Sequence, residues 1–318
     1  MRIAILGATS QIAKDLVLSF LVQSGHELVL YARRPQAVTQ WLASVGLTER
    51  YVVADFAAFN VDEHFDAILN FVGVGDPAQA AAMGASIFDV TLKFDEMALN
   101  YLRHHPGCRY LFLSSGAAYG LSFVEPVEAN TKAVVDINNL QPLDWYGVAK
   151  LHAECRHRSQ PHFAIVDIRV FNYFSHTQDM DARFLITDIV RAIRDKRVLM
   201  TSPDNIVRDY IGPQDFCQLV SAILASSPVN TVVDCYSQQA VDKLTLLAAM
   251  QVKFGLKYRF TEPGANAGVN ATGAKANYYS RNTRAAGLGY QPSFTALQSV
   301  VSEVVKVVPL IPTPKEVV

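Results

Sequence analysis

The sequence is poor in cysteine and has no metal-binding pattern. Its four cysteines are widely spaced, without a Cys-x-x-Cys pair or a cluster with histidine at metal-ligand spacing. They are Cys108, Cys155, Cys217 and Cys235. We therefore expect structural thiols, with neither a disulfide framework nor a metal site. The adjacent His104 and His105 predict solvated residues at the end of a helix.

An excess of charge and long apolar runs are also lacking. The 318 residues include 28 Lys and Arg against 29 Asp and Glu, a formal net charge of -1, which gives no electrostatic case for binding nucleic acid or an anionic membrane. No stretch reaches the roughly 18 uninterrupted apolar residues of a transmembrane helix. The run Ile3–Leu6 is too short for the core of a signal peptide. We expect a cytoplasmic protein without nucleic-acid or membrane partners.

What is present is the composition of a globular protein, since half of the residues are apolar and 18% are charged. Over about the first 170 residues, apolar runs of strand length alternate with longer segments of helical period. This alternation is typical of an α/β fold with a parallel sheet and crossover helices. The predicted strands are Ile3–Leu6, Glu27–Ala32, Tyr51–Ala54, Ala67–Val72, Arg109–Leu113 and Ala164–Val170. The stretch Leu121–Leu143, rich in Pro and Asn, predicts a long surface loop.

After about Asn172 the alternation becomes irregular and predicts a smaller second lobe. Candidate strands are Arg197–Met200, Val207–Ile211, Thr231–Tyr236 and Lys257–Thr261. Candidate helices lie near Ala182–Asp195, Gln214–Ala225 and Phe294–Val305. The glycine- and asparagine-rich segment 264–273 predicts a loop.

The first predicted strand runs directly into Gly7-Ala8-Thr9-Ser10-Gln11-Ile12-Ala13 and then a helix. In a Rossmann-like, doubly wound sheet this is where a dinucleotide pyrophosphate meets a helix N-terminus. Gly7 meets the need for a small residue, while Ser10 and Ala13 replace the later glycines of GxxGxxG. A plain strand-to-helix turn is the alternative. The cofactor residues we expect are Gly7, Thr9, Ser10, Gln11, Ile12, Phe56, Phe71, Val72, Gly73 and Lys150.

The end of the second predicted strand favours NADP over NAD. It reads Ala32-Arg33-Arg34, where an acidic residue would hold the ribose hydroxyls of NAD. The planar donor forks of Arg33 and Arg34 suit a 2′-phosphate, although they could instead cap a solvated turn. Asp55, just past the third strand, is placed to accept from the adenine amino group, or is an ordinary strand-end aspartate.

Tyr146 and Lys150 are four residues apart, so on a helix they project from one face. The phenol has an unperturbed pKa near 10, and a neighbouring ammonium with an oxidised nicotinamide would lower it toward working pH. Such a tyrosine can act as a proton donor or acceptor. About 30 residues upstream, Ser114-Ser115 ends a predicted strand, and its hydroxyl can donate to the same substrate oxygen.

Together these motifs resemble the extended short-chain dehydrogenase/reductase superfamily, the NAD-dependent epimerase/dehydratase group. The resemblance extends to Ser114-Ser115-Gly116-Ala117-Ala118-Tyr119-Gly120, Arg169-Val170-Phe171-Asn172, Arg208-Asp209-Tyr210-Ile211 and Leu288-Gly289-Tyr290-Gln291-Pro292. It implies that Ser115, Tyr146 and Lys150 are catalytic. It also implies that Asn172, Arg208 and Tyr119 contact a nucleotide-linked sugar, although Arg208 could instead form a structural ion pair with Asp209 or Asp215.

The resemblance implies a Rossmann domain over residues 1–171, to which about 214–236 return, and an interleaved substrate-binding lobe mainly over 172–318. We expect an NADP-dependent reductase of a 4-keto nucleotide sugar that forms a homodimer. A C4 epimerase with bound NAD is the first alternative. A non-catalytic dinucleotide-sensing protein is the second, against which the Tyr146/Lys150 pair argues. The absence of an Asp-Glu pair after Ser115 argues against a dehydratase.

Overall fold

The central element is a parallel β-sheet. The structure, a computed structural model, describes residues 1–23, 25–74, 80, 82–120, 122–262 and 275–310. Within these residues, seven strands form the sheet in the order β11-β6-β5-β4-β1-β2-β3. They are β1 (Arg2–Leu6), β2 (Glu27–Tyr31), β3 (Val52–Ala54), β4 (Ala67–Asn70), β5 (Arg109–Ser115), β6 (Ile165–Val170) and β11 (Thr231–Asp234). The strand order reverses between β1 and β4, as in doubly wound folds. The predicted α/β class is confirmed.

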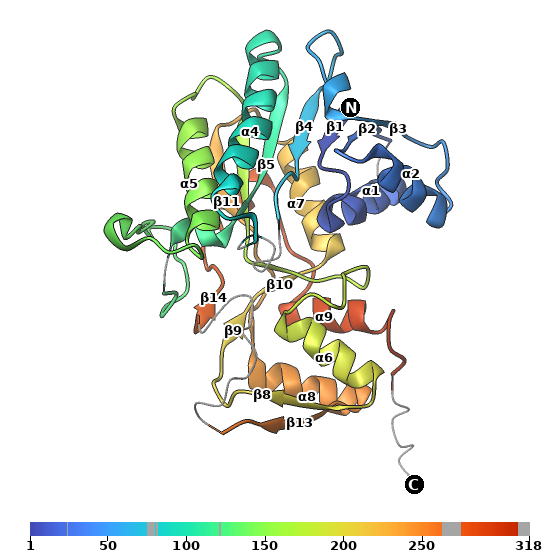
Figure 1. The fold of residues 1–318 in the computed structure, drawn as a ribbon, viewed down its shortest axis with the longest axis vertical. Helices are drawn as coiled ribbons and strands as arrows, with labels where there is room; N and C mark the ends of the chain where they lie inside the picture. Colours follow the sequence, from blue (N-terminus) through green and yellow to red (C-terminus); the bar gives the residue numbers. More distant parts are fainter. Residues whose placement is uncertain (24, 75–79, 81, 121, 263–274, 311–318) are drawn as a thin grey trace.

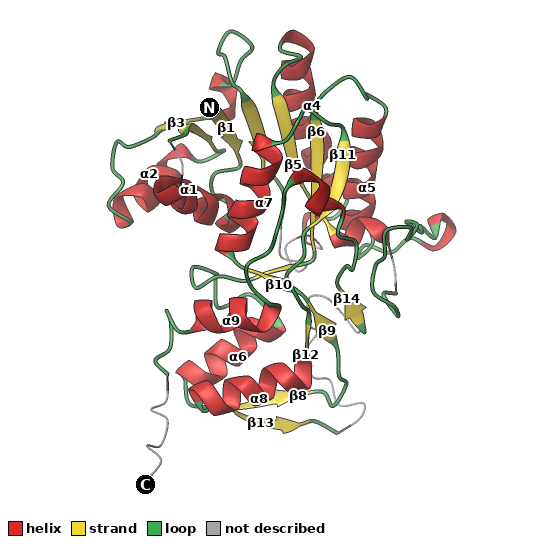
Figure 2. Ribbon diagram, turned by 180° about the vertical axis from the view of Figure 1, so that it is seen from behind, coloured by secondary structure: helices red, strands yellow, loops and turns green. Residues whose placement is uncertain are grey.

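Helices cover both faces of this sheet. One face packs against α1 (Gln11–Gln23), α2 (Pro35–Ser44) and α7 (Pro213–Ala225), the other against α4 (Ser86–His104) and α5 (Trp145–Arg158). Figure 1 shows the α4–α5 side, and Figure 2 shows α7 in front of the sheet. Strand residues alternate between the two cores: Ile3 and Ile5 face α1, whereas Ala4 and Leu6 face the α4–α5 layer.

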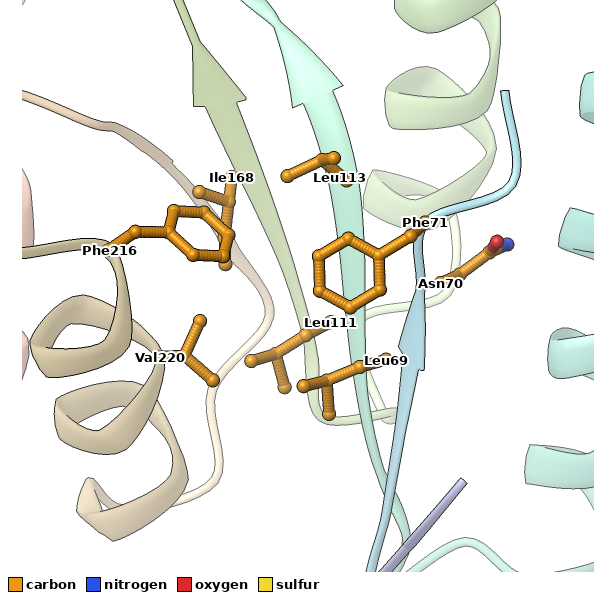
Figure 3. A pocket seen from close by; sticks show the side chains of 8 residues that line it. All are labelled: Leu69, Asn70, Phe71, Leu111, Leu113, Ile168, Phe216 and Val220. Carbon is orange, nitrogen blue, oxygen red and sulfur yellow. The ribbon is translucent and has the colours of Figure 1, made fainter. Parts of the chain in front are cut away.

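The α7 face is closely packed and apolar. A small cavity of about 10 Å³ lies between α7 and the strands, and Phe216 and Val220 of α7 face Phe71 across it (Figure 3). The Asn70 side chain points away from this cavity. Because the space is about that of one water molecule and its walls are apolar, we interpret it as a packing gap without a ligand.

The α4–α5 face encloses charge. His157 of α5 is fully buried, with Nδ1 2.6 Å from Asp167 and Nε2 2.6 Å from Asp95, both also fully buried. Burial opposes the charged imidazole, but the two carboxylates outweigh it and raise the pKa of His157 to about 9. The sequence analysis did not identify this cluster, because Asp95, His157 and Asp167 come from three different elements. His104 ends α4 and is exposed.

The second lobe is built around its own apolar core, below the sheet in both views. Its helices are α6 (Leu185–Arg194), α8 (Lys243–Phe254) and α9 (Ala296–Val304), beside the parallel pair β8 (Val198–Thr201) and β13 (Lys257–Phe260). Helix α8 was missed, although its ends carry sequence signals. The Asp242 side chain caps Thr245 N, and Gly255 ends the helix with φ +71°.

Short strands connect the two lobes. We expected one strand over Val207–Ile211, and this is wrong. The chain bends at Asp209 into β9 (Val207–Arg208), which pairs with β12 (Val241–Asp242) and β14 (Asn277–Tyr278), and β10 (Tyr210–Ile211), which pairs with β7 (Asn172–Tyr173). The predicted loop 264–273 lies outside the described residues. Among the helices that are described, none is long and apolar enough to cross a membrane.

Candidate active site

A cavity of about 950 Å³ lies where the sheet meets the second lobe. One part of it is lined by the segments that follow the carboxyl ends of β1, β2, β3 and β4. The end of β5 and residues on α5 complete this part. The second lobe lines the remainder with side chains that include Phe184, Arg208, Tyr210, Lys275 and Tyr278. Ligands of doubly wound folds bind at this edge of the sheet, which makes the cavity the candidate site.

The phosphate loop after β1 has the geometry of a dinucleotide site. Gly7 has φ +84°, and a Cβ there would lie 2.8 Å from the Val72 backbone nitrogen. The Gly7 and Ala8 amides donate to the Tyr31 carbonyl at 2.9 and 3.0 Å, which fixes the turn. Helix α1 begins at Gln11, so its N-terminus opens on the cavity. Gly7 lets the loop pass close to the backbone at Phe71 and Val72, and the helix end fits a pyrophosphate.

Most of the residues expected from the sequence line this cavity. Those expected to bind the cofactor are Gly7, Thr9, Ser10, Gln11, Ile12, Arg33, Phe56, Phe71, Val72, Gly73 and Lys150. The others are Ser115, Tyr146, Asn172 and Arg208. The structure thus brings together side chains that are up to about two hundred positions apart in the sequence.

Three expected residues do not line the cavity. Arg34 is the exposed N-cap residue of α2. Asp55 accepts from the Ala57 amide at 2.8 Å and caps a short 3-10 helix, as its strand-end interpretation implied. The Tyr119 hydroxyl donates to Asp234 at 2.9 Å, and the Arg169 guanidinium lies 4.2 Å from its ring centroid. These contacts hold Tyr119 in the protein interior, away from the cavity where we expected it to contact the substrate.

Ser115, Tyr146 and Lys150 converge on one wall of the cavity. Ser115 ends β5, while Tyr146 and Lys150 lie one turn apart on α5. The Ser115 hydroxyl is close enough to Tyr146 to affect the pKa of its phenol. Lys150 Nζ donates to the Leu113 carbonyl at 2.7 Å. A strand end and an adjacent helix therefore hold two hydroxyls and an ammonium beside the phosphate loop.

Burial dominates the pKa values of these groups. Burial raises the pKa of Tyr146, and the neighbouring Ser115 hydroxyl opposes that rise. Burial lowers the pKa of Lys150 to about 8, although Asp95, Glu154 and Asp167 act in the other direction. We expected Lys150 and an oxidised nicotinamide together to lower the pKa of Tyr146. In the protein alone the ammonium is directed at the Leu113 carbonyl, and it lies 5.9 Å from the Tyr146 ring centroid.

The second-lobe end of the cavity is cationic. Arg208 is buried, and its Nη1 donates to the Val207 and Lys275 carbonyls at 2.8 Å. Burial lowers the pKa values of both Arg208 and Lys275, and the charge of Arg208 lowers that of Lys275 further. Two adjacent cations at one end of a cavity are suited to a bound polyanion.

Sequence analysis missed Lys275 and Tyr278. Neither belongs to a motif with a recognisable spacing, and both follow a glycine-rich segment. The pairing of β14 with β9 places Tyr278 opposite Arg208, 70 positions earlier in the chain. Asn172 then donates through Nδ2 to the Tyr278 carbonyl at 3.1 Å. Its amide nitrogen is therefore engaged by the protein itself, which leaves Oδ1 for a ligand.

Comparisons with known proteins agree with this architecture. The model of the NAD dependent epimerase/dehydratase family matches residues 3–235. A UDP-glucose-4-epimerase structure from Stenotrophomonas maltophila, with bound NAD and formylated UDP-arabinopyranose, is 16% identical, with a TM-score of 0.77 over 96% of this chain and 97% of that one. UDP-glucuronic acid 4-epimerase from Bacillus cereus, in complex with UDP-glucuronic acid and NAD, is 15% identical, with a TM-score of 0.74 over 96% and 98%.

A third solved structure, dTDP-glucose 4,6-dehydratase from Bacillus anthracis in complex with NAD, is 14% identical. Its TM-score is 0.72, and 96% of this chain and 95% of that chain are covered. At these identities the likeness shows a shared fold. No curated protein sequence matches the chain.

Proposed function

The chain belongs to the NAD dependent epimerase/dehydratase family, and from this membership we propose that it transfers hydride between a nicotinamide dinucleotide and a nucleotide-linked sugar. One observation carries the proposal: Ser115, Tyr146 and Lys150 lie in the same cavity as the phosphate loop and the cations of the second lobe. A dinucleotide-sensing protein has no need of a phenol, a serine hydroxyl and an ammonium on one wall of that cavity.

The residues around the phosphate loop would hold the dinucleotide. The N-terminus of α1 would receive its pyrophosphate, and Lys150 would contact the nicotinamide ribose, as the family resemblance implies. Bound there, a nicotinamide supplies or accepts the hydride. Lys150 is 4% exposed and lines the cavity beside Gly73, where a Cβ would lie 3.5 Å from its Nζ.

The proton chemistry falls to Tyr146 and Ser115. In a reduction, the Tyr146 hydroxyl donates its proton to the carbonyl oxygen of the sugar, and the Ser115 hydroxyl donates a hydrogen bond to that oxygen as charge develops. In the reverse direction Tyr146 accepts the proton. Arg208 and Lys275 would hold the diphosphate so that the sugar reaches Tyr146.

We favour a 4-keto nucleotide-sugar reductase that uses NADP. Arg33 lines the cavity after β2, and the sequence Ala32-Arg33-Arg34 offers no carboxylate for the ribose hydroxyls of NAD. Cells hold reducing power chiefly as NADPH, which is why this preference favours net reduction. The homodimer expected from the family resemblance remains part of the proposal, and light scattering in solution tests it.

A C4 epimerase is the second candidate, because the similar solved structures include two 4-epimerases with bound NAD. A dehydratase is disfavoured on local geometry. By resemblance, dehydratases of this family carry an Asp-Glu pair after the residue that matches Ser115. This chain has Gly116-Ala117 there. A Cβ on Gly116 would lie 2.4 Å from the Phe171 ring, so a larger residue there requires Phe171 to move.

A substrate panel tests the proposal. UDP- and dTDP-linked sugars and their 4-keto derivatives are incubated with the protein and NADPH, and then with NAD. A reductase consumes NADPH only with a keto sugar. An epimerase interconverts two sugars without net change in the dinucleotide. Absence of both reactions across the panel, with dinucleotide binding intact, would favour the sensing role and contradict the proposal.

A further inference from the structure

Tyr278 brings a second phenol from the smaller lobe to the serine of the site. Its hydroxyl lies 3.5 Å from Ser115 Oγ, and both side chains are buried. Tyr278 lines the same cavity as Tyr146, from the opposite lobe. Ser115 therefore has a tyrosine from each lobe near its hydroxyl, Tyr146 of α5 and Tyr278 of β14.

The Tyr278 ring is held firmly in this place. Its carbonyl accepts from Asn172 Nδ2 at 3.1 Å, and β14 pairs with β9 directly at this residue. The ring packs edge-on against Phe123, with 4.7 Å between centroids, and Lys275 Nζ lies 4.7 Å from the Tyr278 centroid. A phenol held by its backbone pairing and by these two ring contacts has little freedom in where its hydroxyl points.

The contact with Tyr278 limits where the Ser115 hydroxyl can donate its hydrogen. A serine hydroxyl has one hydrogen to donate and two lone pairs that accept. The Ala117 amide already donates to Ser115 Oγ at 3.1 Å. A Tyr278 hydroxyl that donates into the second lone pair leaves the serine hydrogen for Tyr146 or for a substrate oxygen. Burial raises the pKa of Tyr278, so this phenol keeps its proton.

We propose that Tyr278 is a positioning residue: its hydroxyl donates to Ser115 Oγ and thereby leaves the single serine hydrogen for the reacting oxygen. The inference rests on the proposed function, which assigns Ser115 to that oxygen. It also makes the smaller lobe part of the catalytic centre, since the donor reaches Ser115 only when β14 is paired with β9.

A double-mutant cycle between Tyr278→Phe and Ser115→Ala tests the inference in the full-length protein. Tyr278→Phe removes one hydroxyl and keeps the ring, so we expect kcat on the keto sugar to fall about tenfold, the worth of one well-placed hydrogen bond. KM and NADPH affinity stay unchanged. In the Ser115→Ala background, Tyr278→Phe has no further effect. Tyr279→Phe, the neighbouring phenol, is the matched control and leaves kcat unchanged.

Two outcomes overturn the inference. An unchanged or raised kcat in Tyr278→Phe means either that Ser115 donates to Tyr278 or that the contact does not contribute to turnover. An equal loss in both backgrounds means that Tyr278 acts independently of Ser115. Either result leaves the proposed function standing, because the wild-type protein still turns over.

A second cycle measures the same contact without turnover. If the hydroxyls are bonded, Tyr278→Phe lowers the melting temperature in the parent protein and lowers it less in Ser115→Ala. Equal losses in the two backgrounds contradict the inference even if the panel reveals no substrate. Failure of the proposed function, by contrast, appears as an inactive wild-type protein whose thermal cycle still shows coupling.

Discussion

The two ends of the cavity are built in different ways. At the cofactor end, the lining residues follow the carboxyl ends of neighbouring parallel strands in short consecutive runs, such as 7 and 9–12, and 71–73. At the substrate end, Asn172, Arg208 and Tyr278 come from two-residue strands that are far apart in the chain. The cofactor end therefore depends on a large sheet, and the substrate end on a few hydrogen bonds between short segments.

This difference has a physical consequence. A seven-stranded sheet with helices on both faces tolerates little movement of the backbone at the phosphate loop. Between the cavity residues Arg208 and Tyr210, Asp209 Oδ1 is a buried polar atom without a hydrogen-bond partner among the described residues. We therefore expect substitutions at the cofactor end to weaken dinucleotide binding by crowding the backbone. At the substrate end, we expect them to weaken substrate binding by removing single charges.

Gly7→Ala should have the largest effect. The new Cβ would lie 2.8 Å from the Val72 backbone nitrogen, at φ +84°. Overpacking of about 3 kcal/mol corresponds to roughly 100-fold weaker NADPH binding, measured by fluorescence titration. Gly46→Ala is the matched control, because Gly46 has φ +74° with nothing within 4 Å of its Cβ position. If Gly7→Ala and Gly46→Ala weakened NADPH binding equally, crowding at Gly7 would not be the explanation.

Lys275→Met should weaken substrate binding and leave the cofactor end intact. Methionine keeps an apolar chain against Tyr278 and removes the charge. Losing one charged hydrogen bond of about 2 kcal/mol weakens UDP binding about 30-fold by calorimetry. NADPH binding stays unchanged, and Lys257→Met on exposed β13 has no effect. Loss of NADPH affinity in Lys275→Met would show that the two ends are not separable.

Asp209→Asn should stabilise the protein in a pH-dependent way. Burial raises the pKa of Asp209 from 3.8 to about 6, against the hydrogen bonds from Ser237. The folded protein thus binds the Asp209 proton more tightly than the unfolded chain does. Ionised Asp209 therefore destabilises the folded protein progressively as the pH rises from about 4 to 6, and fully above that. The raised pKa corresponds to about 3 kcal/mol, so we expect a gain of that size, or about 5 °C, at pH 7.5 and little gain near pH 4.

Calorimetric scans of Asp209→Asn at the two pH values check this prediction, with Asp62→Asn on the exposed surface as the control. A gain that is the same at both pH values would mean that the ionised carboxyl is not the source of the destabilisation.

Arg33→Ala should have the smallest effect, a loss of the preference for NADPH over NADH. Removing one exposed arginine from a 2′-phosphate weakens binding by about 1 kcal/mol, or about fivefold. The melting-temperature shifts given by the two dinucleotides at equal concentration report the preference. Arg34→Ala retains it, because Arg34 is the exposed N-cap residue of α2 and does not line the cavity. A stronger shift with NADH in the unmodified protein would contradict the NADP assignment.

The same contrast explains what the sequence could predict. Strand ends, the phosphate loop and the Tyr146/Lys150 spacing are local patterns, and the six strands expected in the first half appear in the sheet with ends shifted by a few residues at most. The break at Asp209, the buried His157 cluster and the approach of Tyr278 to Ser115 depend on pairings between distant segments. Tyr119 was misplaced for the same reason, since its partner Asp234 lies 115 positions later.

The central claim is that Tyr146 carries the proton in a cavity that also holds a nicotinamide dinucleotide. Tyr146→Phe tests it most directly, with turnover and NADPH affinity measured on the same preparation. The account predicts a loss of about 1,000-fold in kcat, within the range of positioned acid–base groups, and an unchanged dissociation constant for NADPH. Turnover that survives the loss of this hydroxyl would contradict it.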